Sequence, residues 1–93
     1  MKTWPAKDPN EVLDYAFDWS PRNLDGDTIS SFVATVEEGT VVVDDSLFSP
    51  DSLTTVTWLS GGTEGEACKV LLRIMTAMGR TLDETITIKI KSR

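Results

Sequence analysis

Residues 81–91 read TLDETITIKIK, and their apolar and polar side chains alternate almost without a break. The apolar parity contains Leu82, Ile86, Ile88 and Ile90, with Glu84 as its one polar member. The other parity is polar throughout. Because successive side chains of a strand point to opposite faces, this stretch predicts a strand with one buried and one solvated face.

A second strand is predicted directly before it, over residues 66–76, which read EACKVLLRIMT. Its inward parity holds Cys68, Val70, Leu72 and Ile74. The connection, residues 77–80, is short and contains a glycine, as suits a hairpin loop with one residue at positive φ. We therefore expect one long C-terminal hairpin. Its cysteine would be a small buried hydrophobe rather than a reactive thiol.

Residues 53–59 predict the strand that precedes this hairpin. Val56 and Trp58 share one parity of it, whereas Thr55 and Thr57 share the other. Since large apolar side chains favour the core, we expect Val56 and Trp58 to point inward.

Residues 28–36 and 40–43 are rich in β-branched side chains and predict two more strands. The inward face of the first is ambiguous, and a bulge within it would switch the parity. Residues 44–52 contain a proline and many polar side chains. We expect a loop there, with Leu47 and Phe48 tucked under the edge of the sheets.

Residues 12–19 predict a strand with a largely aromatic core face. This face consists of Leu13, Tyr15, Phe17 and Trp19. A helix would place Asp14 and Asp18 four residues apart on one face, where like charges are unfavourable. Residues 20–27 are dense in turn-forming types and predict a loop.

Residues 1–11 contain two prolines and no periodicity, so we expect an irregular N-terminal arm. Trp4 would anchor it by packing on its own domain, which we favour over docking on a neighbouring subunit. Residues 12–91 would form one domain of six or seven antiparallel strands. This pattern predicts a small all-β sandwich, immunoglobulin-like or fibronectin-III-like, with a small barrel as the alternative.

Charge and hydropathy restrict the partners. The net charge of −6 and the pI near 4.4 argue against binding a nucleic-acid backbone. No apolar run reaches the ~18 residues of a membrane span, and the N-terminus lacks the apolar segment of a signal peptide. We expect neither a nucleic-acid nor a membrane partner, and a chain that is made and kept in a cytoplasm or released by lysis.

The composition excludes several kinds of catalytic and metal site. With no histidine and one cysteine, the chain cannot build Ser-His-Asp, Cys-His or His/Cys metal sites. Gly61, Gly62 and Gly65 lack the lysine and the helix of a phosphate loop. We expect no enzyme, cofactor or metal site, and a Ca²⁺ site is a weaker alternative to ordinary turn-forming aspartates. The aspartates concerned are Asp14, Asp18, Asp25, Asp27, Asp44 and Asp45.

Several segments resemble a known family. They are KDPNEVLDY at residues 7–15, DYAFDWS at 14–20, GDTI at 26–29, TWLSGGTEGE at 57–66 and IMTAMGRTLDETITIKI at 74–90. They are similar to small phage and prophage proteins identified as fiber-tail adaptors. The most specific elements are the Asp-Trp-Ser triplet, the Ser-Gly-Gly-Thr-x-Gly loop and the Thr-x-x-Gly-Arg hairpin. The sequence departs from the family pattern at Cys68, where the family leads us to expect an aromatic residue. The similarity is also weaker over residues 43–52.

The resemblance implies a non-enzymatic structural protein of a virion or phage-tail-like particle, assembled in the host cytoplasm. It would join tail or connector to fibres or neighbouring virion proteins, and copies in a ring would contact one another heterologously. We expect the arm and the Gly-rich loop to make the contacts, because both are irregular or polar yet contain a tryptophan or three glycines. The candidate partner-binding residues are Trp4, Lys7, Asp8, Gly61, Gly62, Thr63 and Gly65.

Two alternative functions fit the same composition. A capsid decoration protein or glycan-binding module of the host surface would also be a small rigid sandwich. Glycan binding would need exposed aromatics, whereas Trp19 and Trp58 are both expected in the core. An acidic inhibitor that mimics nucleic acid would need its carboxylates on one face, whereas here they are spread over turns and interleaved with Lys and Arg.

Overall fold

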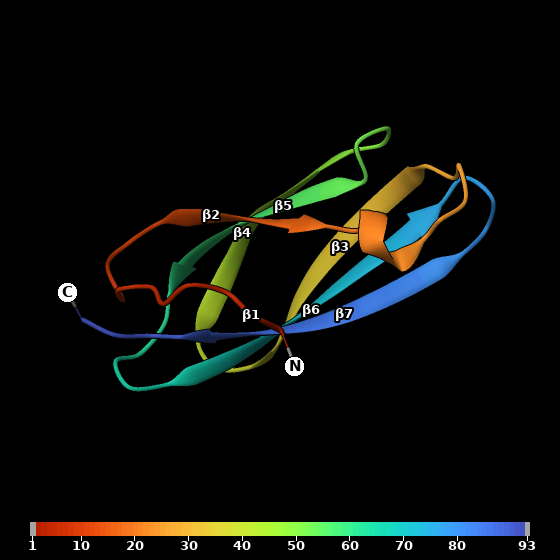
Figure 1. Cartoon of the computed structure of the whole chain (residues 1–93). Helices are drawn as coiled ribbons and strands as arrows, with labels where there is room; N and C mark the ends of the chain where they lie inside the picture. The colour runs from red at the N-terminus through yellow and green to blue at the C-terminus, as the bar shows by residue number, and fades with distance from the viewer. Residues whose placement is uncertain (1, 93) are drawn as a thin grey trace.

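Within residues 2–92, seven strands form two sheets that pack face to face (Figure 1). The computed structural model describes residues 2–92, so Met1 of the expected arm lies outside the described residues. The strands are β1 (Lys2–Thr3), β2 (Leu13–Asp18), β3 (Ile29–Glu38), β4 (Val41–Ser49), β5 (Thr54–Gly61), β6 (Ala67–Thr76) and β7 (Thr81–Lys89). A 3-10 turn, η1 (Ser20–Arg22), follows β2. The strand orders are β1-β7-β6-β3 and β2-β5-β4, which confirms the predicted all-β sandwich.

The predicted C-terminal hairpin is confirmed, and it forms the centre of the four-stranded sheet. β6 and β7 pair in antiparallel register from Ala67 opposite Lys89 to Met75 opposite Thr81. Six of their inward side chains are at most 1% exposed, namely Cys68, Val70, Leu72, Ile74, Ile86 and Ile88, whereas Leu82 is partly buried. The polar interruption, Glu84, has a physical reason, because its carboxylate lies at the rim of the core. There it pairs with Lys2 at 3.3 Å and Arg22 at 2.6 Å.

β3 contains the irregularity that its ambiguous pattern suggested. Its register against β6 shifts between Ile29 and Ser31 and again near its end. The first shift lets Ile29 and Phe32, three residues apart, both face the core, at 2% and 8% exposure. Val33 therefore points outward.

The expected facing of β5 is wrong. Thr55 and Thr57 lie in the core at 0% and 1% exposure, whereas Val56 and Trp58 lie half-buried on the outer face. The reason is the register with β2, in which Thr57 is paired with Tyr15. Paired residues of antiparallel strands project to the same face. Because β2 buries its aromatic parity, the threonines follow it inward.

β4 is longer than expected, and the predicted loop over residues 44–52 is wrong for most of its length. A register shift after Val43 absorbs one extra residue, and pairing with β5 then continues to the end of the strand. Leu47 and Phe48 are 48% and 37% exposed rather than tucked under the sheets. The polar residues are tolerated because β4 is an edge strand.

Residues 2–11 run along the edge of the four-stranded sheet. β1 pairs in parallel with β7, and Lys7 forms a further bridge to Ile90. Trp4 is 8% exposed and stacks on Tyr15, with 5.0 Å between ring centroids. The preferred prediction, that Trp4 packs on its own domain, is confirmed.

The connections gather at the two ends of a molecule with principal extents of 41 × 21 × 17 Å. The Glu66 end, on the left in Figure 1, comprises residues 8–12, 39–40, 61–66 and 90–92. The Asp27 end, on the right, comprises residues 19–28, 50–53 and 77–80. The described part of the chain contains no helix with the length and apolar character needed to cross a membrane.

Candidate partner interface

Lys7 joins the two segments that the sequence singled out for partner contacts. Its side chain is fully buried, and Nζ donates to the carbonyl oxygens of Gly61 at 2.7 Å and Asp8 at 2.8 Å. Its backbone is held between Lys89 and Lys91 of the C-terminal segment. The buried side chain of Lys7 therefore links the N-terminal arm to the Gly-rich loop, although residues 7 and 61 are far apart in the sequence.

Asp8 begins a tight turn at the same end. Its Oδ1 accepts from the amide of Asn10 at 2.8 Å, and its own amide donates to Glu11 at 2.8 Å. Trp4, the other candidate from the arm, donates from Nε1 to the carbonyl of Ala16 at 3.3 Å. Its buried ring leaves little surface for a partner, so a contact role for Trp4 stays a prediction.

The Gly-rich loop needs its glycines for backbone reasons. Gly62 has φ +100°, and a Cβ there would lie 2.8 Å from Cδ1 of Ile90. Gly61 and Gly65 also have positive φ, at 71° and 84°. The loop thus approaches the end of β7 closely, and the Gly65 amide donates to the Ile90 carbonyl at 2.9 Å. Thr63 and Gly65 remain exposed, so of the predicted loop residues these two present surface.

Glu66 holds the loop in place, a role that the sequence did not reveal. One carboxylate oxygen, Oε1, is the common acceptor of four groups: Thr40 N at 3.0 Å, Thr40 Oγ1 at 2.8 Å, Thr63 N at 3.1 Å and Cys68 Sγ at 3.1 Å. The bonds from Thr40, followed by those from Cys68 and Thr63, lower the pKa of Glu66 to about 2. The carboxylate therefore ties the β3–β4 turn to the loop. Nothing local in the sequence indicates this, because Thr40 lies far away along the chain.

Cys68 is buried, as predicted. Burial raises the pKa of its thiol, and the hydrogen bond to Glu66 adds to this. The space around it is tight, because a Cβ built on Gly39 would overlap Sγ. Cys68 thus packs as a small side chain beneath the β3–β4 turn.

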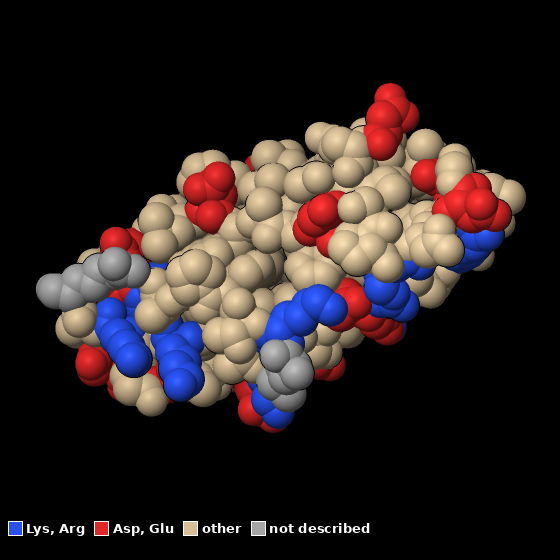
Figure 2. Space-filling model, in the orientation of Figure 1, with Lys and Arg blue, Asp and Glu red and all other residues tan. Residues whose placement is uncertain are grey.

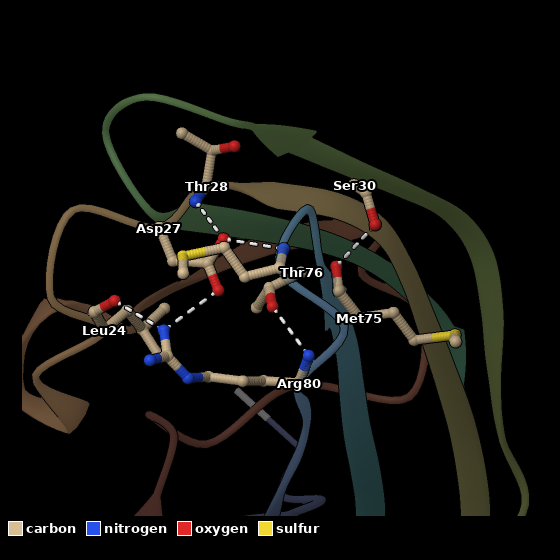
Figure 3. Close-up of polar contacts among 8 residues, drawn as sticks. Leu24, Asp27, Thr28, Ser30, Met75, Thr76 and Arg80 are labelled. Atoms are coloured by element: carbon tan, nitrogen blue, oxygen red, sulfur yellow. Dashed lines mark hydrogen bonds and ion pairs between the residues drawn. The ribbon is translucent and has the colours of Figure 1, made fainter.

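The Asp27 end has a second polar network, drawn in Figure 3. Asp27 Oδ2 pairs with Nη1 of Arg80 at 3.0 Å, and the same nitrogen donates to the carbonyl of Leu24 at 2.7 Å. Asp27 Oδ1 accepts from the amides of Thr28 at 2.8 Å and Met78 at 3.1 Å. Two of the family-like segments, GDTI and the Thr-x-x-Gly-Arg hairpin, therefore meet in space, which sequence spacing alone could not show.

The charge of Asp27 is maintained by this network. Burial alone would raise the pKa of its carboxyl. Hydrogen bonds from the Thr76 hydroxyl and from the amides of Thr28 and Met78 act in the opposite direction. With the Arg80 guanidinium, they hold the pKa of Asp27 below its ordinary value.

The aspartates considered for Ca²⁺ are not brought together. Asp27 is engaged by Arg80, whereas Asp14 and Asp45 flank Trp58 on the outer face of the smaller sheet. Among residues 2–92 there is no group of three or more His, Cys, Asp or Glu placed to hold a metal ion. The same residues enclose no detectable pocket. The surfaces that remain to be explained are therefore the loops and the outer faces of the sheets.

The architecture defines an immunoglobulin-like β-sandwich. The solution structure of the PKD domain from KIAA 1837 protein aligns with a TM-score of 0.51 and 15% sequence identity, over 97% of this chain and 83% of that one. At this identity the likeness concerns the fold alone.

The family is defined by sequence. The profile described as "Podophage GP4 fiber-tail adaptor protein gp77" matches residues 7–89, and the chain belongs to this family. A comparison with curated proteins gave no match. The resemblance to fiber-tail adaptors is therefore confirmed. The family is one of phage structural adaptors rather than enzymes, and membership implies association with the virion and binding to tail or fibre proteins.

Proposed function

We propose that the protein acts, without catalysis, as a rigid joint in a podophage particle, connecting tail or connector to fibres or neighbouring virion proteins. The family match over residues 7–89 carries this proposal. The two polar networks support it, because loops that are already ordered lose less conformational freedom when a partner binds. Assembly would take place in the host cytoplasm, through protein–protein contacts.

Within this function we assign one contact surface to the Glu66 end. Thr63 and Gly65 are exposed there, and Asp8 lies half-buried beside the same loop. Lys7 and Glu66 would position this surface from beneath rather than touch the partner, because their polar atoms already bind Gly61, Thr40 and Thr63.

Co-sedimentation with particles lacking this protein tests the function. Purified protein should bind isolated tails or head–tail connectors of the phage that encodes it. Binding to empty heads alone would indicate a decoration protein and contradict the proposal. Binding to neither would remove the adaptor function altogether.

A matched pair of variants tests the surface. Thr63→Arg places a bulky cation on the exposed loop, and we expect it to reduce binding to tails at least ten-fold. Ser52→Arg makes the same change in an exposed loop at the Asp27 end and should leave binding unaltered. Equal binding by both variants would exclude the Glu66 end as the contact surface.

A further inference from the structure

The outer face of the β2-β5-β4 sheet is apolar, although none of the elements described between residues 2 and 92 covers it. The register aligns side chains in rows across the sheet, with Val56 between Ala16 and Leu47, and Trp58 between Asp14 and Asp45. Val12, Val42 and Leu47 are 57%, 52% and 48% exposed. We call this surface the apolar–acidic face. It consists of Val12, Ala16, Val42, Leu47, Val56 and Trp58, with Asp14, Asp18 and Asp45 among them.

All formal charges on this face are negative. No Lys or Arg occurs between Asn23 and Cys68, nor between Asp8 and Pro21. The ion pairs among residues 2–92 use the carboxylates of Asp27, Glu38, Asp83 and Glu84, none of which lies on β2, β4 or β5. Figure 2 shows the same separation: red and tan cover the upper part of the molecule, over β2 and β5, and blue lies largely along the lower part.

The opposite sheet has a different outer face. There Arg73 forms a bidentate ion pair with Asp83, in which Nε donates to Oδ1 at 2.7 Å and Nη2 to Oδ2 at 2.9 Å. Lys69 Nζ lies 3.6 Å from Oε1 of Glu38. Two cations of that sheet, Arg73 and Lys69, are thus paired within the chain, whereas Lys89, exposed on the same face, has no ion pair among the described residues. The carboxylates of Asp14 and Asp45 have no such partner among the described residues.

We infer that the apolar–acidic face is a second docking surface, and that it receives another virion protein whose contacting patch has apolar side chains flanked by Lys or Arg. The inference rests on the proposed adaptor function, since a joint needs two contact surfaces and the Glu66 end supplies one. Apolar contact with Val42, Leu47 and Trp58 would supply affinity, and the flanking carboxylates would select a basic patch.

A second copy of this chain fits the face poorly. In a two-fold symmetric dimer the same patch meets itself, so the aspartates would face aspartates. In a head-to-tail assembly that placed the face on the outer face of the other sheet, it would meet Arg73 and Lys69, which are already paired. Lys89 would be the one cation of that face without an ion pair among the described residues. A basic patch on a different protein avoids both conflicts.

Two valines provide a matched test. Val42→Asp changes the apolar–acidic face, whereas Val33→Asp makes the same change on the other outer face. Both residues lie on edge strands, at 52% and 57% exposure. We expect Val42→Asp to weaken co-sedimentation with tails lacking this protein at least ten-fold and Val33→Asp to leave it unchanged. The melting temperature of each variant shows whether it is folded.

A second variant addresses charge without disturbing apolar packing. Asp45 is exposed, so Asp45→Lys should fold normally and also weaken binding, and wild-type binding should decline as salt rises. If Val42→Asp and Asp45→Lys both bind tails as well as the wild type does, this inference is wrong while the adaptor function stands. Absence of wild-type binding to tails would overturn both.

Two other outcomes would assign the face to a different occupant and overturn the inference. The first is concentration-dependent self-association in sedimentation velocity that Val42→Asp abolishes, which would identify a second copy. The second is displacement from tails by host surface polysaccharide, which would identify a glycan.

Discussion

Nε1 of Trp19 donates a 3.0 Å hydrogen bond to Oγ1 of Thr55, and both side chains are fully buried. The bond joins the end of β2 to the neighbouring strand β5 on the inner face of the three-stranded sheet. Thr57, two residues further along the same face, is equally buried, yet its hydroxyl has no hydrogen-bond partner among the described residues. The two threonines therefore form a natural comparison.

Thr55→Val should destabilise the protein by about 1–3 kcal/mol, because the Trp19 N–H would be left buried without an acceptor. Thr57→Val removes an unsatisfied hydroxyl from the core and should be neutral or stabilising. Urea denaturation of both variants measures the difference. Equal destabilisation would contradict the assigned hydrogen bond.

Ile88→Asp should prevent folding. The side chain is fully buried in the centre of the core, and an unpaired carboxylate there should cost more than about 4 kcal/mol, a large share of the stability of a small domain. Lys89→Asp changes an exposed neighbour of opposite parity and should be nearly silent. Far-UV circular dichroism and thermal melting distinguish the two, and equal damage would refute the facing of β7.

The Glu66 network predicts an acid-dependent loss of stability. The pKa of Glu66 is lowered to about 2 from 4.5, so folding favours its ionised form. This contribution is complete above pH 4.5 and is lost as the pH falls toward 2. In Glu66→Gln the melting temperature should fall less steeply across this window than in wild type.

Glu37→Gln is the control for this experiment, because Glu37 is exposed near the end of β3 and is not among the groups that bind Glu66. Its acid profile should follow that of wild type. A Glu66→Gln profile parallel to wild type would show that the carboxylate network does not contribute to stability between pH 2 and 4.5.

Asp27→Asn should lower the melting temperature by roughly 5–10 °C, since it removes the charge partner of Arg80 and the bonds that join residues 24–28 to the β6–β7 turn. Asp25→Asn is the matched control. Asp25 is exposed in the same loop with φ +56°, a conformation that asparagine tolerates. Differential scanning calorimetry compares the melting temperatures of the two variants. An unchanged melting temperature in Asp27→Asn would show that this ion pair does not stabilise the fold.

How far the sequence predicted the fold depends on the range of the interactions involved. Alternation is local, so residues 81–91 and the inward residues of β6 could be recognised directly. In β5 the same reasoning failed, because both parities are plausible in isolation and Trp58 outranks Thr57 in hydrophobicity. The pairing of Thr57 with Tyr15 decided the matter.

In the candidate site, too, local features could be predicted from the sequence, whereas contacts between distant residues could not. The glycines of residues 61–65 could be predicted to form a loop, and the resemblance to fiber-tail adaptors followed from short segments of sequence. The joining of Lys7 to Gly61 and of Asp27 to Arg80 could not be predicted, because each pair is more than fifty residues apart along the chain.

By itself, then, the sequence determined the sandwich class, the C-terminal hairpin, the family and the absence of histidine chemistry, since these depend on composition, local periodicity and motif. Tertiary structure alone decided which face of β5 is buried, how far β4 extends and where unpaired carboxylates surround exposed valines. These features arise from strand register, which brings distant residues into rows that local pattern does not specify.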